Sequence, residues 1–233
     1  MTALLSDSRL GLPRVHVRSI ESTNTFARRL AAQGAPHGTL VTADAQTAGR
    51  GRQGRAWTAP PGTALLCSWV IRDPSPLLSL AAGVAVAAVC GTGARLKWPN
   101  DVLIDGRKVA GILVEGRPQE HWAVLGIGLN VALDIDQLPD ELRERAGSLG
   151  LGPDAIEPTL AALRQGLEHW LAAGTADVLE AVRGRDALRG LPVRWDDGSG
   201  IAAGVDHAGR LMVALGDGSS VALDAGEVHL IRS

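Results

Sequence analysis

Residues 46–55 read QTAGRGRQGR, and the rest of the chain is organised around this segment. It holds three glycines and three arginines, with no acid and no aliphatic side chain larger than alanine. Glycine lets the backbone approach a ligand closely, and arginine offers a planar fork of donors that suits carboxylate and phosphate. Because the segment has no large apolar side chain to bury, it predicts an anion-binding loop that is mobile when empty and ordered when occupied.

Three other interpretations fit parts of this segment. Residues 49–54 match the G-x-G-x-x-G dinucleotide fingerprint, but that fingerprint needs a helix at its last glycine, and Pro60 and Pro61 exclude a long helix there. An Arg-Gly segment can be a disordered nucleic-acid tail, although tails usually lie at termini and this one lies between two strand-like runs. A plain solvated loop fits these residues about equally well when they are taken alone.

The composition limits the class of protein. With 233 residues, 45% hydrophobic, the chain can form one sizeable core with room for a small appended domain. Its net charge of -2 argues against a general nucleic-acid binder, which would be basic. No apolar run reaches the length of a membrane span, and residues 1–12 carry no visible signal peptide. Cys67 and Cys90 lie in apolar stretches and are predicted to be reduced core residues of a cytosolic protein. The histidines are scattered along the chain without the spacing of metal ligands, so they predict no metal site.

Five rare residues stand out against this composition. Of 23 basic residues, 21 are arginine, so the two lysines, Lys97 and Lys108, are exceptions. The asparagines are equally rare, at Asn24, Asn100 and Asn130. Because arginine cannot mimic a compact ammonium group at a tight site, we expect the lysines to serve a function that arginine cannot.

Apolar periodicity predicts a mixture of strands and helices. The strands are expected at 13–19, 38–45, 63–71 and 121–131, and the helices at 25–33, 77–90, around 138–146, 157–173 and 176–188. Ser22, Thr23 and Asn24 precede the first helix; one of them suffices as a cap, so the others could bind a polar ligand head. The glycines within residues 126–130 would allow a ligand to approach the last strand closely.

Residues 95–115 contain a predicted hairpin. Asp105-Gly106 is a strong two-residue turn signal. A regular register from this turn pairs the residues as Ile104–Arg107, Leu103–Lys108 and Asp101–Ala110. Asp101 and Lys108 then share one face as diagonal neighbours, roughly 7–8 Å apart, and Lys97 has the same parity. The alternative is an ordinary cross-strand salt bridge on a solvated face, which would contribute little.

The composition changes at Gly190. Beyond it, only short apolar runs occur, separated by turn sequences such as DDGSG and GDGS. This pattern predicts a small five-stranded barrel. We therefore expect two domains, at residues 1–188 and 189–233.

Five motifs, in this order, resemble those of the biotin–protein ligases from about Val15 onward: Ser22-Thr23-Asn24, Gly49-Arg50-Gly51-Arg52-x-Gly54-Arg55, Lys97-Trp98-Pro99-Asn100-Asp101, Lys108-Val109-Ala110-Gly111-Ile112 and Gly126-Ile127-Gly128-Leu129-Asn130. Each motif alone is weak, but the ordered set is specific. The resemblance implies an α+β fold: a mixed β-sheet backed by helices, as in class II synthetase-like catalytic domains, followed by a small SH3-like barrel.

The resemblance also implies a two-step reaction. Biotin and ATP, with Mg²⁺, give biotinyl-5′-AMP and pyrophosphate, and a lysine of a biotin carboxyl carrier protein then takes the biotinyl group and releases AMP. Only about fourteen residues precede the first predicted strand, which favours the shorter, monofunctional class without a DNA-binding winged helix. The expected setting is cytoplasmic, with a carrier protein as partner, no DNA, no membrane and a possible homodimer.

The resemblance assigns roles residue by residue. The catalytic candidates are Arg50, Arg52, Asp101 and Lys108. The biotin-binding candidates are Ser22, Thr23, Asn24, Gln46, Gly49, Arg50, Gly51, Arg52, Trp57, Lys108 and Gly111. The nucleotide-binding candidates are Arg52, Arg55, Lys97, Asn100 and Asn130. Asp101 could orient the lysines or receive the incoming lysine's ammonium. The cationic side chains suit the formation of the adenylate, because they place positive charge where anionic charge develops. A loop that closes over the water-sensitive adenylate would act as a lid.

Two alternatives have different activities. A lipoate–protein ligase shares the fold and the adenylate chemistry but lacks the pairing of Gly-Arg-Gly-Arg with Lys-Trp-Pro-Asn-Asp. A biotin sensor would bind biotin without transferring it. Release of AMP, measured with and without a carrier protein, separates these possibilities.

Overall fold

A computed structural model describes residues 10–224, 226 and 228–231, so the expectation about a signal peptide lies mostly outside the described residues. The helices are α1 (Thr23–Ala32), α2 (Leu78–Val89), α3 (Asp140–Arg143), α4 (Ile156–Ala172) and α5 (Thr175–Gly184). The strands of the first sheet are β1 (Arg14–Ile20), β2 (Leu40–Gln46), β3 (Ala64–Arg72), β4 (Arg95–Lys97), β5 (Asp101–Ile104), β6 (Arg107–Arg117) and β7 (Trp122–Asn130).

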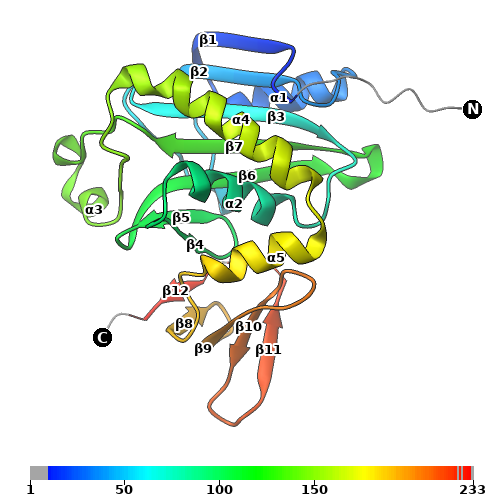
Figure 1. Cartoon of the computed structure of the whole chain (residues 1–233). Coiled ribbons are helices and arrows are strands. Elements are labelled where there is room, and N and C mark those ends of the chain that lie inside the picture. The colour runs from blue at the N-terminus through cyan, green and yellow to red at the C-terminus, as the bar shows by residue number, and fades with distance from the viewer. Residues whose placement is uncertain (1–9, 225, 227, 232–233) are drawn as a thin grey trace, which may run out of the picture.

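The first sheet has seven strands in the order β1-β2-β3-β7-β6-β5-β4. Only the β1–β2 pair is parallel; every other neighbouring pair is antiparallel. The sheet is therefore mixed, as expected from the sequence. Figure 1 shows α2, α4 and α5 on one side of this sheet and α1 on the other.

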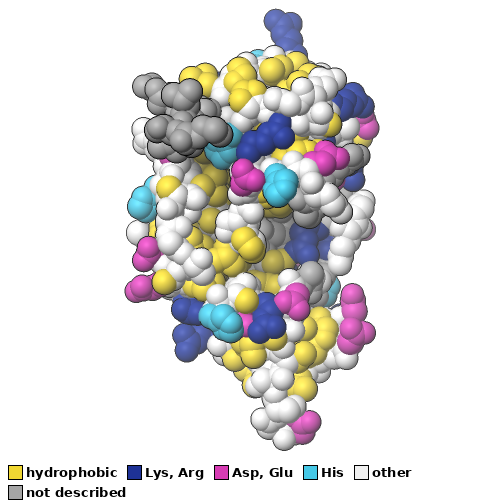
Figure 2. All heavy atoms as spheres, turned by 90° about the vertical axis from the view of Figure 1, so that its right-hand side faces the viewer, with side chains coloured by type: hydrophobic (Ala, Val, Ile, Leu, Met, Phe, Trp, Pro, Cys, Tyr) yellow, Lys and Arg dark blue, Asp and Glu magenta, His cyan; other side chains and the backbone are white. Residues whose placement is uncertain are grey.

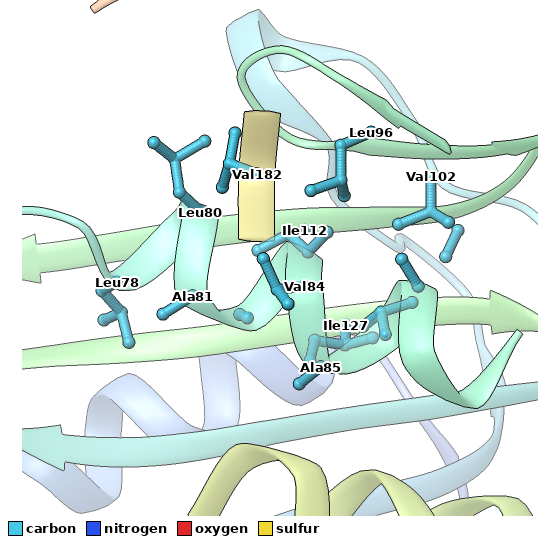
Figure 3. Close-up of a cluster of buried hydrophobic side chains, with 14 of the residues drawn as sticks. Leu78, Leu80, Ala81, Val84, Ala85, Leu96, Val102, Ile112, Ile127 and Val182 are labelled. Atoms are coloured by element: carbon cyan, nitrogen blue, oxygen red, sulfur yellow. The ribbon is translucent and has the colours of Figure 1, made fainter. Parts of the chain in front are cut away.

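The two faces of the sheet bury different side chains. On the first face, α2 is apolar nearly all round and packs between the sheet, α4 and α5, which explains its run of alanine, valine and leucine. Figure 3 shows this cluster, in which Val84 of α2 lies near Ile112 of β6 and Ile127 of β7. On the opposite face, α1 packs on a smaller cluster that includes Val70 and Val124. Because α1 is short, it leaves part of its face of the sheet uncovered.

A second sheet follows α5. Its five strands are β8 (Pro192–Trp195), β9 (Gly198–Val205), β10 (Leu211–Ala214), β11 (Ser220–Leu223) and β12 (His229–Leu230), in the order β11-β10-β9-β8-β12. All pairs are antiparallel, which fits the expected small barrel. Its apolar side chains join the core that contains α2, and Trp98 Nε1 donates to Gly209 O at 3.0 Å. The division after residue 188 stays a prediction, since Leu188 belongs to this shared core.

The surface carries charges of both signs. Figure 2 shows one face, on which the coloured side chains of Lys and Arg alternate with those of Asp and Glu around apolar patches. In the described part of the chain, no helix is long and apolar enough to cross a bilayer.

Candidate active site

Three glycines, Gly111, Gly126 and Gly128, form the floor of a cavity on the α1 face of the sheet, and we call them the glycine floor. Gly111 of β6 lies directly opposite Gly128 of β7, and Gly126 precedes Gly128 by two residues, on the same side. A Cβ at Gly126 would overlap Asn24 Oδ1, and a Cβ at Gly128 would lie 2.7 Å from Trp57 Nε1. The glycines therefore make room for side chains that arrive from α1 and from the loop after β2.

One end of the cavity is polar and nearly closed to solvent. Ser22 caps α1 by accepting from Thr25 N–H at 3.4 Å, and Thr23 N–H donates to Gln46 Oε1 at 2.7 Å. Ser22, Thr23 and Asn24 are all at most 4% exposed, and all line the cavity together with Gln46. The sequence predicted this grouping, and the parallel β1–β2 pair places the end of β2 beside the start of α1.

The Arg-Gly segment folds back on itself as a tight loop. Gly51 N–H donates to Arg55 O at 2.7 Å, and Trp57 N–H donates to Gly49 O at 2.9 Å. Arg50 and Ala56 form an isolated antiparallel bridge between the two arms. The prediction of a loop at this place is confirmed, while its predicted mobility stays a prediction.

Trp57 covers the glycine floor. Its ring packs so closely that a Cβ at Gly111 would lie 3.1 Å from Trp57 Cζ3. Its Nε1 is buried, and no described residue accepts its hydrogen. Lys108 Nζ lies 5.7 Å from the ring centroid, within the range of a cation–π contact. Trp57, a biotin-binding candidate from the sequence, thus forms an apolar wall of the first cavity.

A second cavity adjoins the first on the side of the hairpin. Arg52, Trp57, Asn100 and Lys108 line both cavities, while Arg55, Lys97 and Asp101 line the second one. Asn100 connects two elements, since its Oδ1 accepts from Arg52 Nη1 at 3.1 Å and its Nδ2 donates to Ile112 O at 3.0 Å. In the described part of the chain, cationic side chains and one acid, Asp101, therefore surround a space next to the polar cavity.

The hairpin differs from the predicted register by a β-bulge. Ile104 pairs with Arg107 and Leu103 with Lys108, as expected, but Asp101 faces Gly111 instead of Ala110. The extra residue in β6 is Val109, and a bulge of this kind shifts which side chains share a face. As a result, Lys108 and Gly111 both line the first cavity although their positions differ by an odd number. Asp101 and Lys108 do share a face, with Lys108 Nζ 2.6 Å from Asp101 Oδ1.

Most predicted site residues converge on the two cavities, but two do not line either of them. Gly49 lies beside the first cavity, where a Cβ would lie 2.8 Å from Gln46 Nε2. Asn130 is buried, and its Nδ2 donates to Gly147 O at 2.8 Å. Gly147 N–H in turn donates to Lys108 O at 2.8 Å, so Asn130 supports the backbone of Lys108 rather than facing the second cavity.

The sequence analysis missed two polar residues at the site. Ser68 of β3 is fully buried and lies within hydrogen-bond distance of both Thr23 and Asn24. Glu115 of β6 contacts Asn24, Arg28 and Arg50. A serine within the apolar strand ALLCSWVIR was a visible signal, since a buried hydroxyl needs a partner.

Neither a thiol nor a metal-binding cluster provides an alternative chemistry among the described residues. Cys67 lines the cavity, but burial raises the pKa of its thiol far above the ordinary range, so it stays protonated. Cys67 and Cys90 are both free. No group of three or more His, Cys, Asp or Glu side chains in the described chain could hold a metal ion.

Comparison with known proteins agrees with this geometry. The Biotin/lipoate A/B protein ligase family matches residues 16–131. The biotin–[acetyl-CoA-carboxylase] ligase of Mycobacterium tuberculosis is 38% identical, covering 91% of this chain and 86% of the relative. The structure of the Aquifex aeolicus biotin protein ligase in complex with biotin and ATP superposes with a TM-score of 0.77 at 25% identity, covering 94% of this chain and 99% of that one.

A third relative is longer than this chain. The bifunctional ligase/repressor BirA of Bacillus spizizenii is 42% identical over 60% of this chain, which spans only 47% of the relative. This chain thus covers about half the length of the first curated relatives it matches. The two-cavity site, the mixed sheet and these similarities together establish that the chain belongs to the biotin–protein ligase family.

Proposed function

We propose that this protein is an ATP-dependent biotin–protein ligase that acts on a biotin carboxyl carrier protein. The observation that carries the proposal is the junction of the two cavities, where Lys108, Arg52 and Asn100 line both. One cavity ends in uncharged polar groups that suit a ureido ring, and the other is lined by cations that suit a nucleotide. A ligand with a carboxylate would place it at this junction.

In the first step, a carboxylate oxygen of biotin attacks the α-phosphorus of ATP, and pyrophosphate leaves. Both reactants are anions, so their approach requires positive charge placed in advance. Lys108 is assigned to the carboxylate and adenylate oxygens, and Arg50 and Arg52 to the phosphate. The contact of 2.6 Å between Lys108 Nζ and Asp101 Oδ1 supports Asp101 as the group that orients this lysine.

In the second step, the ε-amine of the carrier lysine attacks the acyl carbon of biotinyl-5′-AMP, and AMP leaves with the bonding electrons. The amine must lose its proton before it attacks, and Asp101 is the carboxylate assigned to receive it in this proposal. The Arg-Gly loop, with Trp57 beneath it, excludes water from the adenylate. Arg55, Lys97 and Asn100 are assigned to the nucleotide.

Magnesium belongs to this proposal as the companion of ATP. Mg²⁺ commonly binds through one or two carboxylates together with substrate phosphates and water. Among the described residues, the second cavity offers one such carboxylate, that of Asp101, which fits a metal ion delivered by the nucleotide better than a dedicated protein site. Bound there, the ion would neutralise phosphate charge.

The proposed partner is the carrier domain of a carboxylase, because two of the relatives carry the name biotin–[acetyl-CoA-carboxylase] ligase. We propose a cytoplasmic setting, which the two free cysteines favour. A homodimer is a further possibility that the resemblance raises, and sedimentation of the purified protein tests it.

The direct test is incubation with biotin, MgATP and a carrier domain, followed by a streptavidin blot of the carrier. Mass spectrometry of the sample without carrier should find biotinyl-5′-AMP bound to the protein. A parallel reaction with lipoate in place of biotin separates the two ligase activities. Unreacted biotin and ATP, or transfer of lipoate alone, would contradict the proposal.

A further inference from the structure

A chain of buried polar groups runs behind the polar end of the first cavity. It begins at Glu115, passes through Asn24 and Ser68, and ends at Thr23 and Gln46. Asn24 and Thr23 are 4% exposed, and Ser68 is fully buried. Water therefore has little access to the middle of this chain, at Asn24 and Ser68, and there the positions of a few protons decide which groups donate and which accept.

Glu115 fixes the first link of this chain. Its Oε2 accepts from Asn24 Nδ2 at 2.9 Å, and Leu113 O lies 3.4 Å from the same nitrogen. A carbonyl oxygen and a carboxylate can only accept, so the NH₂ group of Asn24 must face them. Arg28 and Arg50 contact Oε1 of Glu115 at 3.2 and 3.3 Å and hold this carboxylate in place.

The orientation of Asn24 then fixes the hydroxyl groups. Asn24 Oδ1 lies 2.6 Å from Ser68 Oγ and can only accept, so the single hydroxyl proton of Ser68 points at it. Ser68 Oγ also lies 2.8 Å from Thr23 Oγ1. Because Ser68 has no second proton, Thr23 must donate in this contact. The reverse direction would leave Asn24 Oδ1 buried against another acceptor, which is costly.

The last link determines what the cavity presents to a ligand. Gln46 Oε1 lies near two possible donors of Thr23: the backbone N–H at 2.7 Å and the hydroxyl oxygen Oγ1 at 3.0 Å. Because the backbone N–H already donates to Gln46 Oε1, this oxygen does not require the hydroxyl proton as well. With its proton committed to Ser68, Thr23 Oγ1 offers only lone pairs toward the cavity, whereas Gln46 Nε2 and the hydroxyl of Ser22 offer protons. A cyclic urea matches this arrangement, since its N–H groups need an acceptor and its carbonyl needs donors.

We infer that Glu115 and Ser68 are positioning residues that set the donor–acceptor polarity of the head-group cavity and thereby select a ligand with a ureido N–H. This inference rests on the proposed function, because it takes the head group to be that of biotin. Neither residue needs to touch the ligand: each acts through Asn24 and Thr23.

The test compares biotin with its two cyclic carbamate analogues, each of which replaces one ureido N–H by oxygen. One of the two carbamates presents its ring oxygen to Thr23 Oγ1, so that two acceptors face each other. In the wild-type protein, calorimetry should therefore show that biotin binds clearly more tightly than this carbamate. Ser68→Ala removes the acceptor of the Thr23 proton, which can then turn either to Gln46 Oε1, 3.0 Å away, or to that oxygen of the analogue. The preference for biotin over this analogue should therefore fall, by up to about tenfold, the effect of one hydrogen bond of ordinary strength.

Glu115→Gln gives an independent variant. The side-chain amide that this substitution introduces can face Asn24 with either its oxygen or its NH₂ group, so only Leu113 O, 3.4 Å away, still favours the original orientation of Asn24. Where Asn24 inverts, Ser68 is released to donate to Thr23, and the preference for biotin should fall by less than in Ser68→Ala. The matched control is Thr39→Val: Thr39 is 2% exposed, and its hydroxyl is bonded only to Pro36 O, at 2.8 Å, in the described structure.

Thermal melts are measured for all three variants. The control should keep the wild-type ratio of affinities even if its melting temperature falls. If Ser68→Ala and Glu115→Gln are folded and weaken biotin and both carbamates equally, or not at all, the inference is wrong. If wild-type protein binds no biotin, the proposed function itself fails, which is a different result.

Discussion

Lys108 Nζ lies 2.6 Å from Asp101 Oδ1 and 5.7 Å from the centre of the Trp57 ring, so the ammonium group is held between an acid and an aromatic face at the junction of the two cavities. The Lys108 side chain is 36% exposed and that of Asp101 is 19% exposed. In an ion pair on a solvated surface, both side chains would be more exposed than these two. The backbone of Lys108 is held as well, because its N–H donates to Arg145 O at 2.8 Å.

The first prediction concerns Lys108→Arg. A planar guanidinium is bulkier than an ammonium and cannot occupy the same place between Asp101 and Trp57. It should displace the attacking carboxylate, and a displacement near 1 Å costs about a hundredfold in rate. The measurement is the rate of biotinyl-adenylate formation at saturating biotin, with folding checked by a thermal melt. A folded variant with a rate near wild type would show that Lys108 does not contact the reacting groups.

The second prediction concerns the glycine floor. In Gly128→Ala, the new Cβ would lie 2.7 Å from Trp57 Nε1, and the strand backbone on which it sits is central in the sheet. Trp57 must therefore move, and the affinity for biotin should fall by about tenfold or more, while overpacking costs on the order of 1–3 kcal/mol of stability.

Gly93→Ala is the control for this prediction, because no atom lies within 4 Å of its added Cβ among the described residues. It should bind biotin like the wild-type protein. Calorimetric titration with biotin measures both variants. Unchanged affinity in a folded Gly128→Ala variant would mean that Trp57 does not rest on this floor in the working protein.

The sequence predicts the elements and the polar end of the site well, because both depend on local signals. Apolar periodicity marks the long helices, and rare residues such as Asn24 and Asn100 mark positions that line the first cavity. The bulge in β6 has no such signal. Val109 and Ala110 are both fully buried, so an apolar run there fits either register, and only the three-dimensional pairing decides between them.

The missed residues share one physical cause. Ser68 and Glu115 act through contacts with α1, which lies 44 and 91 residues away from them along the chain. A serine in an apolar strand signals a buried hydroxyl that needs a partner, but that partner lies across the fold and cannot be identified from the sequence. A contact across the fold also decides the role of Asn130, which the resemblance assigned to the nucleotide but whose amide supports the segment that holds the backbone of Lys108.

The third prediction concerns the Arg-Gly loop. Its arginines contact other elements in the described structure: Arg50 pairs with Glu115 at 3.3 Å, and Arg52 donates to Asn100 Oδ1 at 3.1 Å. Such partly exposed polar contacts are weak, and the loop itself buries no large apolar side chain. Trypsin should therefore cleave after Arg50, Arg52 or Arg55 quickly in the empty protein and slowly when biotin is bound.

Cleavage after Arg189 provides an internal reference, because this arginine is exposed, lies between α5 and β8, and lines neither cavity. Its rate should not respond to biotin. Mass spectrometry of the fragments over time reads both rates from one sample. Equal rates of loop cleavage with and without biotin would remove the argument that the loop acts as a lid.

The fourth prediction concerns pH and the edge strand β1. Arg14 makes a bidentate contact with Glu157 of α4, with Nη1 to Oε2 at 2.8 Å, and this hydrogen bonding holds the pKa of Glu157 below its ordinary value of 4.5. A carboxyl group with a lowered folded-state pKa stabilises the fold above its unfolded pKa, and this contribution is lost as the pH falls through the folded value. Glu157 is largely exposed, so the effect is small.

Glu157→Gln should melt on the order of 1–2 °C below wild type at pH 7. This difference in melting temperature should shrink as the pH falls below about 4.5, because the wild-type carboxyl then protonates and loses its pairing with Arg14. Calorimetric scans of both proteins from pH 7 down to pH 3 measure the difference directly. A difference that stays constant or grows across this range would show that the ion pair between β1 and α4 does not contribute to stability through its charge.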